Sequence, residues 1–263
     1  MIDTHSHLFV EEFADDFDQV IQRSKEAGVS RVFMPNIDDT TVDAMLDAGC
    51  RYPGYCYPML GFHPTSVDDS SFEKVVKMKE RLVDGHPFIA IGEVGLDLYW
   101  DKTYLLQQQK ILEEQIRWAL DWDLPLVIHC REAFKELFEV LTYYKDTSLS
   151  GVFHSFTGTK EEVEEVLTYP NFMIGINGVV TFKKSMLPET LRIVPMERLV
   201  LETDSPYLAP VPYRGRRNES SYLKNVAEKL GEIYQVNGEV ITAQTTQNAL
   251  KVFKRVDEDI KVY

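Results

Sequence analysis

The sequence predicts an α/β protein with the fold of a (β/α)8 barrel of the TIM type. Eight short apolar runs alternate with amphipathic segments of helical length, and 263 residues suit one such barrel. A doubly wound open sheet is the competing architecture, but it more often has a glycine-rich phosphate loop after its first strand, and none follows here. Because no repeat, low-complexity segment or Pro/Gly linker interrupts the alternation, we expect a single domain over residues 1–263.

The apolar runs are the expected strands, because each is of strand length and most are followed by a segment with helical spacing. They cover residues 1–8, 31–37, 55–64, 88–97, 125–130, 151–156, 171–177 and 198–204. In the first run, MIDTHSHL, alternate side chains share a face of the strand. His5 and His7 therefore point the same way, while Thr4 and Ser6 point away.

The segments between the runs are the expected helices. The clearest cover residues 12–27, 103–122, 131–144 and 159–168, and the patterns are weakest over 39–49 and 185–192. In the segment 131–144, for example, Phe134, Leu137 and Leu141 fall on one stripe. The tail predicts two further helices, over 219–234 and 239–255, which we expect to pack on the outside of the barrel.

Composition bounds the class of protein. A hydrophobic content of 44% suits a substantial core and is too high for a disordered chain. We see no long uncharged apolar run and no signal peptide, and the three cysteines lack zinc or redox spacing, so we expect a cytoplasmic protein with reduced thiols. The net charge of -14 argues against a module that wraps duplex DNA with a basic surface, but not against an enzyme whose phosphate contacts come from metal ions.

Metal-binding residue types cluster where the apolar runs end. Taken alone, each of these residues is more often a structural hydrogen-bonding group or a helix cap. Together they fall at the C-terminal ends of six strands, which surround one mouth of a barrel, where such enzymes place their active site. They are His5 and His7, His63, Glu93, His129, His154 and Asp204. His86 lies in a turn at the opposite end, and we assign it no function.

Four histidines with Glu93 and Asp204 are more ligands than one tetrahedral ion needs. Imidazole and carboxylate suit zinc, manganese and other divalent ions, and a carboxylate can bridge two of them. The set therefore predicts a two-metal site, with ions about 3.5–4 Å apart that hold the attacking and leaving oxygens. Glu202 shares a face with Asp204 and could support the ligands from behind.

The chain resembles the TatD family of metal-dependent deoxyribonucleases, within the amidohydrolase-like metal-dependent hydrolases. The resemblance rests on DTHSHL, GFHP, IGEVGLDLYW, PLVIHCREA, GVFHSFTG and LVLETDSPYLAP followed by RGRRNES, which occur in the family's order between Ile2 and Ser220. GEVGLD and LETDSPYLAP together are quite specific, whereas many amidohydrolases have the HxH pair. The resemblance implies a TIM-like barrel that hydrolyses phosphodiesters, described in the family as 3′→5′ exonuclease action on single-stranded DNA, and in some members on RNA.

The resemblance also implies roles for individual residues. His5 and His7 would bind one ion, Glu93 would bridge two, and His129 and His154 would bind the second. Asp204 would ligate a metal or act as general base, and His63 would contact the scissile phosphate or help the leaving group. The chain departs from the family at Phe9, where an aspartate is usual, at Lys135, where an acidic residue is usual, and at Ser220, where a proline is usual.

Cations and aromatic residues near the strand ends are the candidate substrate contacts. Loops after the last barrel strands often bind phosphate, and arginine can hold it with two parallel hydrogen bonds. Aromatic side chains at the mouth could stack unpaired bases or simply pack between loop and helix. The candidates are Arg214, Arg216 and Arg217 after the eighth run, Arg131 after His129, and Tyr99 and Trp100 after the fourth run.

We therefore predict a divalent-metal deoxyribonuclease whose main partner is single-stranded DNA. One alternative is an amidohydrolase or lactonase that acts on a small substrate with the same barrel. Another is a binding protein with a structural metal, which the surplus of ligands disfavours, because structural sites are usually closed and four-coordinate. The expected cofactors are two divalent metal ions, among Mg, Mn and Zn.

Overall fold

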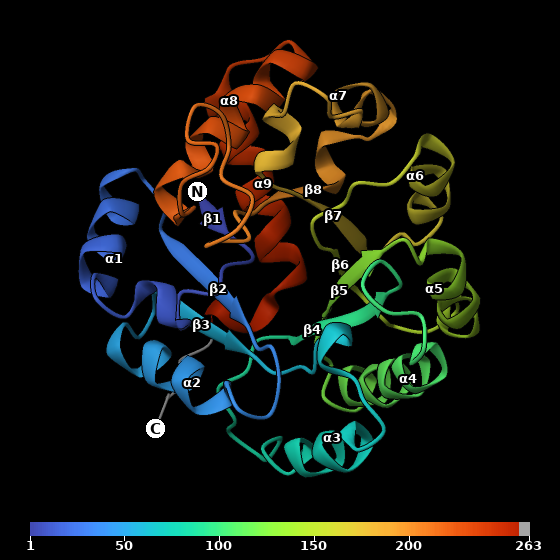
Figure 1. Cartoon of the computed structure of the whole chain (residues 1–263). Helices are drawn as coiled ribbons and strands as arrows, with labels where there is room; N and C mark the ends of the chain where they lie inside the picture. The colour runs from blue at the N-terminus through green and yellow to red at the C-terminus, as the bar shows by residue number, and fades with distance from the viewer. Residues whose placement is uncertain (258–263) are drawn as a thin grey trace.

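The computed structural model describes residues 1–257, which form eight strands. Figure 1 shows helices placed around the strands. One strand forms in each of the eight predicted runs, and only the fifth strand extends past its run, by one residue. The strands are β1 (Ile2–Asp3), β2 (Arg31–Pro35), β3 (Cys56–Met59), β4 (Ile91–Asp97), β5 (Leu126–Arg131), β6 (Gly151–Phe153), β7 (Phe172–Ile176) and β8 (Leu199–Leu201). All neighbouring strands pair in parallel, as a βα alternation requires.

The parallel ladders run as β1-β2-β3 and as β4-β5-β6-β7-β8, and single bridges join them at both seams. At one seam Ser6 pairs with Ser205, and at the other Leu60 pairs with Ile91. The Gly92 N–H donates to the Leu60 carbonyl at 2.9 Å, which continues the hydrogen bonding from β3 to β4. Hydrogen bonds therefore pass around the whole ring of strands, and the predicted (β/α)8 barrel is confirmed.

Helices other than α9 cover the outside of the ring. In α4, for example, Ile111, Ile116 and Ala119 are buried at helical spacing. Thr159 caps the start of α6 and forms a capping box with Glu162. The helices are α1 (Phe17–Glu26), α2 (Val42–Arg51), α3 (Ser71–Lys79), α4 (Leu105–Asp121), α5 (Phe134–Leu141), α6 (Lys160–Leu167), α7 (Leu187–Thr190), α8 (Leu223–Tyr234) and α9 (Gly238–Val252). None of the helices within residues 1–257 is long and apolar enough to cross a membrane.

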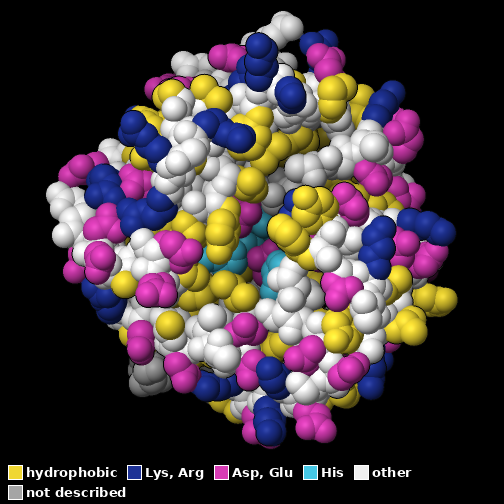
Figure 2. All heavy atoms as spheres, in the orientation of Figure 1, with side chains coloured by type: hydrophobic (Ala, Val, Ile, Leu, Met, Phe, Trp, Pro, Cys, Tyr) yellow, Lys and Arg dark blue, Asp and Glu magenta, His cyan; other side chains and the backbone are white. Residues whose placement is uncertain are grey.

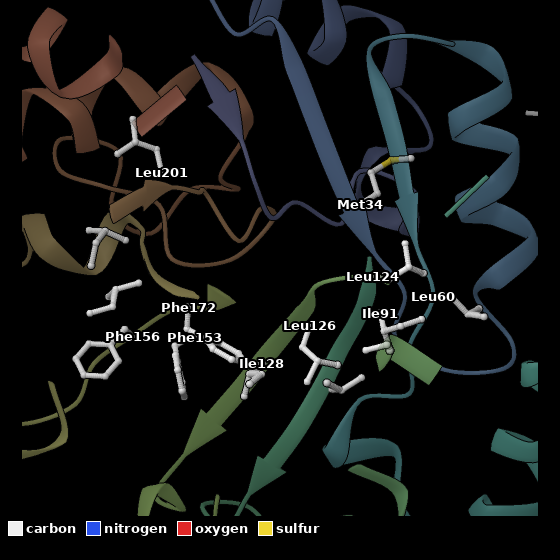
Figure 3. Packing of buried hydrophobic residues seen from close by; sticks show 14 of the residues in the cluster. Met34, Leu60, Ile91, Leu124, Leu126, Ile128, Phe153, Phe156, Phe172 and Leu201 are labelled. Carbon is white, nitrogen blue, oxygen red and sulfur yellow. The ribbon is translucent and has the colours of Figure 1, made fainter. Parts of the chain in front are cut away.

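Strand residues alternate between two hydrophobic layers. One set, which includes Leu126 and Ile128 of β5, packs against the helices, and Figure 3 shows part of this outer layer with Phe153 and Phe172. The other set, which includes Val127, faces the barrel interior. Because side chains alternate along a strand, His129 continues the inward-facing row of Val127.

Helix α9 differs from the expectation that both C-terminal helices pack outside the barrel. Its end brings Val252 and Phe253 into the interior layer, where the Phe253 ring lies 4.7 Å from that of Phe33. In Figure 1 the helix lies behind the ring of strands, across its amino-terminal opening. An amphipathic pattern predicts that a face is buried but not which surface buries it. The interior layer and α9 fill the amino-terminal end of the barrel, which we call its floor. The polar residues at the carboxyl ends of the strands therefore lie over packed hydrophobic side chains.

Candidate metal centre

The predicted ligands meet in one cavity of about 690 Å³ at the carboxyl ends of the strands. Figure 2 shows histidine side chains at the bottom of a hollow in this face, with hydrophobic side chains on either side. His7, His63, Glu93, His129, His154 and Asp204 line the cavity. His5 lies fully buried against them, with its ring stacked on that of His154 at a centroid distance of 3.3 Å.

Glu93 is the centre of the cluster. Its Oε2 lies 3.1 Å from His5 Nε2 and 3.5 Å from His7 Nε2. Its Oε1 lies 2.9 Å from His129 Nδ1 and 3.2 Å from His63 Nε2. The two oxygens of one buried carboxylate therefore face two different pairs of imidazoles, which is the arrangement that a bridging ligand needs.

Asp204 faces the same cluster from the opposite side. Its Oδ1 lies 3.6 Å from His7 Nε2, and its Oδ2 lies 3.7 Å from His154 Nε2. The backbone at Asp204 is left-handed, with φ of 57°, and its N–H donates to the His5 carbonyl at 2.9 Å. Such a conformation costs a non-glycine residue about 1–3 kcal/mol and occurs often at functional sites. Here the turn directs the carboxylate into the cavity.

Glu202 lies directly behind His154. Its Oε1 is 3.0 Å from His154 Nδ1 and accepts a hydrogen bond of 2.5 Å from the Ser155 N–H. A side chain at Gly175 would overlap this carboxylate, so the glycine leaves the room that Glu202 occupies. A carboxylate behind a histidine fixes the orientation of its ring, which leaves Nε2 of His154 facing Glu93 and Asp204.

Burial and neighbouring charges set the protonation of the cluster. Burial, together with the charge of His154, lowers the pKa of His5 to about 3, so His5 is neutral and keeps a lone pair. Burial also opposes the charged form of His154, but Glu202, Glu93 and Asp204 outweigh it and raise its pKa to about 10. The histidines likewise outweigh burial at Glu93 and Asp204 and hold the pKa of both carboxyls below the usual range.

The donor set fits divalent metal ions. His5 Nε2 and His7 Nε2 lie only 3.2 Å apart, and both face the same oxygen of Glu93. Glu93 belongs to two groups of candidate ligands, and within each group the ligand atoms lie within 4.8 Å of one another. One group is His5, His7 and Glu93, and the other is His63, His129 and Glu93. Imidazole nitrogens and carboxylate oxygens are the ligands that zinc and manganese take in proteins.

His7 is oriented without the carboxylate that the family usually has at position 9. Its Nδ1 lies 3.2 Å from the Pro35 carbonyl, which can accept the ring N–H. Phe9 instead places its ring 5.9 Å from the His7 ring, edge to face. The backbone carbonyl therefore supplies the orienting partner that metal-binding histidines usually have.

Asp97 and Tyr207 are among the cavity residues that sequence reasoning missed. Asp97 Oδ2 lies 2.9 Å from His129 Nε2, and the ring of Tyr207 lies 6.3 Å from the ring of His7. The sequence does contain a signal for Asp97, because Asp97 stands four residues after Glu93 in one strand, and such residues lie on the same face. For Tyr207, three residues after Asp204, no comparable pattern exists.

Arg131 and Trp100 lie in the cavity wall, as a substrate contact would require. The Arg131 guanidinium lies 3.6 Å from the centre of the Tyr99 ring and 5.5 Å from that of Trp100. The Trp100 side chain is 70% exposed. Within the described part of the chain, no carboxylate pairs with Arg131, and no other lysine or arginine lines the cavity.

The three arginines after β8 do not line this cavity. Arg214 packs over the ring of Phe182 at 3.6 Å, and Arg217 pairs with Asp16 at 2.7 Å. Arg216 lines a different cavity, beside Arg23 of α1. The structure therefore brings none of these three arginines into the metal cavity, and their role as phosphate contacts stays a prediction.

Comparison with known proteins agrees with this geometry. The model of the family described as TatD related DNase matches residues 2–254. An uncharacterized metal-dependent hydrolase of Bacillus subtilis, YabD, is 36% identical over 255 residues, covering 97% of this chain and 99% of that protein. The 3′-5′ ssDNA/RNA exonuclease TatD of Erwinia billingiae is 33% identical over 260 residues, with 97% and 99% covered.

The solved structures include a TatD homologue from Escherichia coli, with a TM-score of 0.87 and 28% identity over 97% of this chain and 98% of the other. The match of sequence and fold extends over almost the whole chain. This chain belongs to the TatD-related DNase family and is a metal-dependent hydrolase that acts on ester bonds.

Proposed function

We propose that this protein is a divalent-metal-dependent exonuclease that removes nucleotides from the 3′ end of single-stranded DNA and accepts RNA. The observation that carries the proposal is the combination of the Glu93 cluster with Arg131 and Trp100 in one cavity. A cluster of this kind attracts divalent ions, the arginine suits a phosphate, and the exposed indole suits an unpaired base. The relatives named 3′-5′ ssDNA/RNA exonuclease support this choice of substrate.

Two ions would share Glu93. His5 and His7 face one of its oxygens, so they would hold one ion with help from Asp204. His129 would hold the other with His154, as the family resemblance implies, and His63 lies close enough to the same oxygen to join them. Ions bound here supply Lewis acidity and lower the pKa of bound water.

Asp204 is the proposed general base. The neighbouring histidines keep its carboxylate ionised at neutral pH, and its side chain is 14% exposed, so it can meet a water molecule in the cavity. His63 lies in the cavity wall with 13% of its side chain exposed, where it can contact the phosphate or protonate the leaving oxygen. Glu202 holds His154 and does not reach the cavity, because it is fully buried.

Arg131 and Trp100 are the proposed substrate contacts. Arginine can donate two parallel hydrogen bonds to a phosphate, and stacking on an aromatic ring contributes about 1–3 kcal/mol per base. The Arg131 guanidinium packs on the ring of Tyr99, which holds it in place. A base in a duplex has its faces covered by its neighbours, whereas a base at a single-stranded end can leave the stack and reach the indole.

A gel assay with 5′-labelled single-stranded DNA tests the proposal. Protein with Mg²⁺ or Mn²⁺ should shorten the strand progressively from the 3′ end, and EDTA should abolish the reaction. Asp204→Asn should reduce turnover by about 10²–10⁴-fold with the fold intact, as expected for loss of a general base. Asp101→Asn is the control, because Asp101 is exposed and its carboxylate accepts a hydrogen bond from the N–H of Thr103 in its own loop.

A second candidate is an amidohydrolase or lactonase that acts on a small anionic substrate. Among the described residues that line the cavity, Arg131 is the one lysine or arginine. This favours a small substrate, because a long polyanion usually meets several cations. Protein that binds two ions per chain and cleaves no nucleic acid, but hydrolyses small lactones or amides, would decide for this candidate.

A further inference from the structure

Asp97 is a buried carboxylate at the end of β4 whose two oxygens have different partners. Its Oδ2 lies 2.9 Å from Nε2 of His129, whose other ring nitrogen faces Glu93. Its Oδ1 accepts backbone hydrogen bonds from Tyr99 at 3.0 Å and from Trp100 at 3.3 Å. Only 2% of Asp97 is exposed. One side chain therefore contacts both a candidate metal ligand and the aromatic wall of the cavity.

The main chain of Asp97 is held independently of its carboxylate. The Gln108 side chain of α4 accepts from the Asp97 N–H at 2.9 Å and donates to the Asp97 carbonyl at 3.1 Å. Gln108 is itself buried. This pair of bonds fixes the end of β4, so a change confined to the Asp97 carboxylate leaves the strand end anchored.

The segment that Asp97 holds carries Trp100, which lines the cavity, and Tyr99 beside it. Tyr99 and Trp100 pack edge to face with centroids 4.9 Å apart, and the Arg131 guanidinium lies on Tyr99. Arg131 ends β5, two residues after His129. The metal ligand and the aromatic wall thus meet Asp97 from two adjacent strands.

We propose that Asp97 is a positioning residue that couples the metal centre to the substrate-binding wall. It holds His129 with Nε2 protonated, so that Nδ1 keeps its lone pair toward the metal, and it holds the backbone of Tyr99 and Trp100 with its other oxygen. The metal half of this inference stands on the ligand geometry alone. The substrate half rests on the proposed function.

Asp97→Asn tests the coupling, because an amide cannot serve both partners. If the amide oxygen faces His129, its NH₂ group faces the N–H groups of Tyr99 and Trp100, and two donors meet. If the oxygen faces those N–H groups, the NH₂ meets Nε2–H of His129 and favours the tautomer with its proton on Nδ1, which blocks the metal. Either orientation disrupts one of the two functions.

The first experiment is a calorimetric titration with Mn²⁺ alone, on the wild type, Asp97→Asn and Asp101→Asn. The second is binding of a fluorescein-labelled oligothymidine in EDTA, where no cleavage occurs, with Trp100→Ala as a reference for loss of the aromatic contact. We expect Asp97→Asn to lose about 10–100-fold in Mn²⁺ affinity or to match the loss of oligothymidine binding in Trp100→Ala. Asp101→Asn, which changes an exposed carboxylate in the same loop, should match the wild type in both.

A change in Trp100 emission on adding Mn²⁺ gives a readout that a general loss of stability does not produce. We expect the change in the wild type, its absence in Trp100→Phe, and its reduction in Asp97→Asn. The inference is overturned if Asp97→Asn equals the wild type in all three measurements: Mn²⁺ affinity, oligothymidine affinity and the change in Trp100 emission. If the wild type fails to bind oligothymidine, the proposed function fails, and the Mn²⁺ and emission measurements still decide the role of Asp97.

Discussion

Arg217 donates to both carboxylate oxygens of Asp16, at 2.7 and 2.8 Å. The same guanidinium also donates to the Glu12 carbonyl and lies over the ring of Phe13. An arginine that the sequence favours as a phosphate contact thus fastens the loop after β8 to the segment before α1. This bidentate geometry is the one in which an arginine holds a phosphate, and in this structure Asp16 accepts both hydrogen bonds.

Arg217→Ala should therefore affect stability and not substrate binding. The pair is partly exposed, so we expect its loss to lower the free energy of unfolding by less than about 1 kcal/mol, with an unchanged KM for oligonucleotide. Thermal melting and steady-state kinetics measure the two effects. Asp16→Asn should lower the melting temperature somewhat more, because Asp16 Oδ2 also accepts a hydrogen bond from Arg23 at 3.0 Å. A raised KM in Arg217→Ala alone would support the phosphate contact that the sequence predicts.

Arg131→Ala should have the opposite effect. A hydrogen bond to a charged group contributes about 1.5–3 kcal/mol, so we expect KM for oligonucleotide to rise by about 10–100-fold. The matched control is Arg216→Ala, which removes an arginine from the cavity beside α1 and should leave KM unchanged. Equal effects of the two substitutions would mean that distributed charge, and not a contact in the cavity, holds the substrate.

The strand ends and their inward-facing residues could be predicted from the sequence because the side-chain period of a strand is fixed. That rule predicts that His129 and His154 share one mouth with Glu93, and the structure brings them together. It does not predict the partners of loop residues. Arg217 meets Asp16 across 201 residues, and only the folded chain creates that contact. The place of α9 under the barrel, and the double contact of Asp97, are likewise properties of tertiary packing.

Phe253→Ala should test the role of α9 as the floor of the barrel. Phe253 is fully buried against the interior layer, and truncation of a buried phenylalanine costs about 3–5 kcal/mol. Denaturant unfolding measures this loss, with Val240→Ala as an exposed control on the same helix. Since the floor does not touch the cavity, kcat at low temperature should stay near that of the wild type. A mild loss of stability would show that α9 only lies against the barrel.

His86 should make the protein less stable in mild acid. Burial, together with nearby Arg255, lowers the pKa of His86 to about 4, whereas an unfolded histidine titrates near 6.5. Between these values the unfolded chain binds a proton that the folded chain does not, so stability is complete above about pH 6.5 and falls as the pH drops toward 4. His86→Gln removes this titration. The wild type should melt above the variant at pH 7, and this difference in melting temperature should narrow toward pH 4.5. A constant difference would contradict the lowered pKa of His86.

Metal binding should strengthen with pH, because an ion competes with a proton on His154. The three carboxylates around that ring outweigh its burial and raise its pKa to about 10, so at neutral pH the ring is protonated in the absence of metal. Raising the pH toward 10 frees the lone pair, and the apparent affinity should rise by at most about tenfold per pH unit. Calorimetry between pH 6 and 9, in buffers with different ionisation enthalpies, measures both the affinity and the proton released.

His86→Gln is the control. Its metal affinity should change with pH as that of the wild type does, because His86 lies at the opposite end of the barrel. A flat profile without proton release would mean that His154 does not ligate the ion, which would leave His63 and His129 as the imidazoles that complete the second position with Glu93.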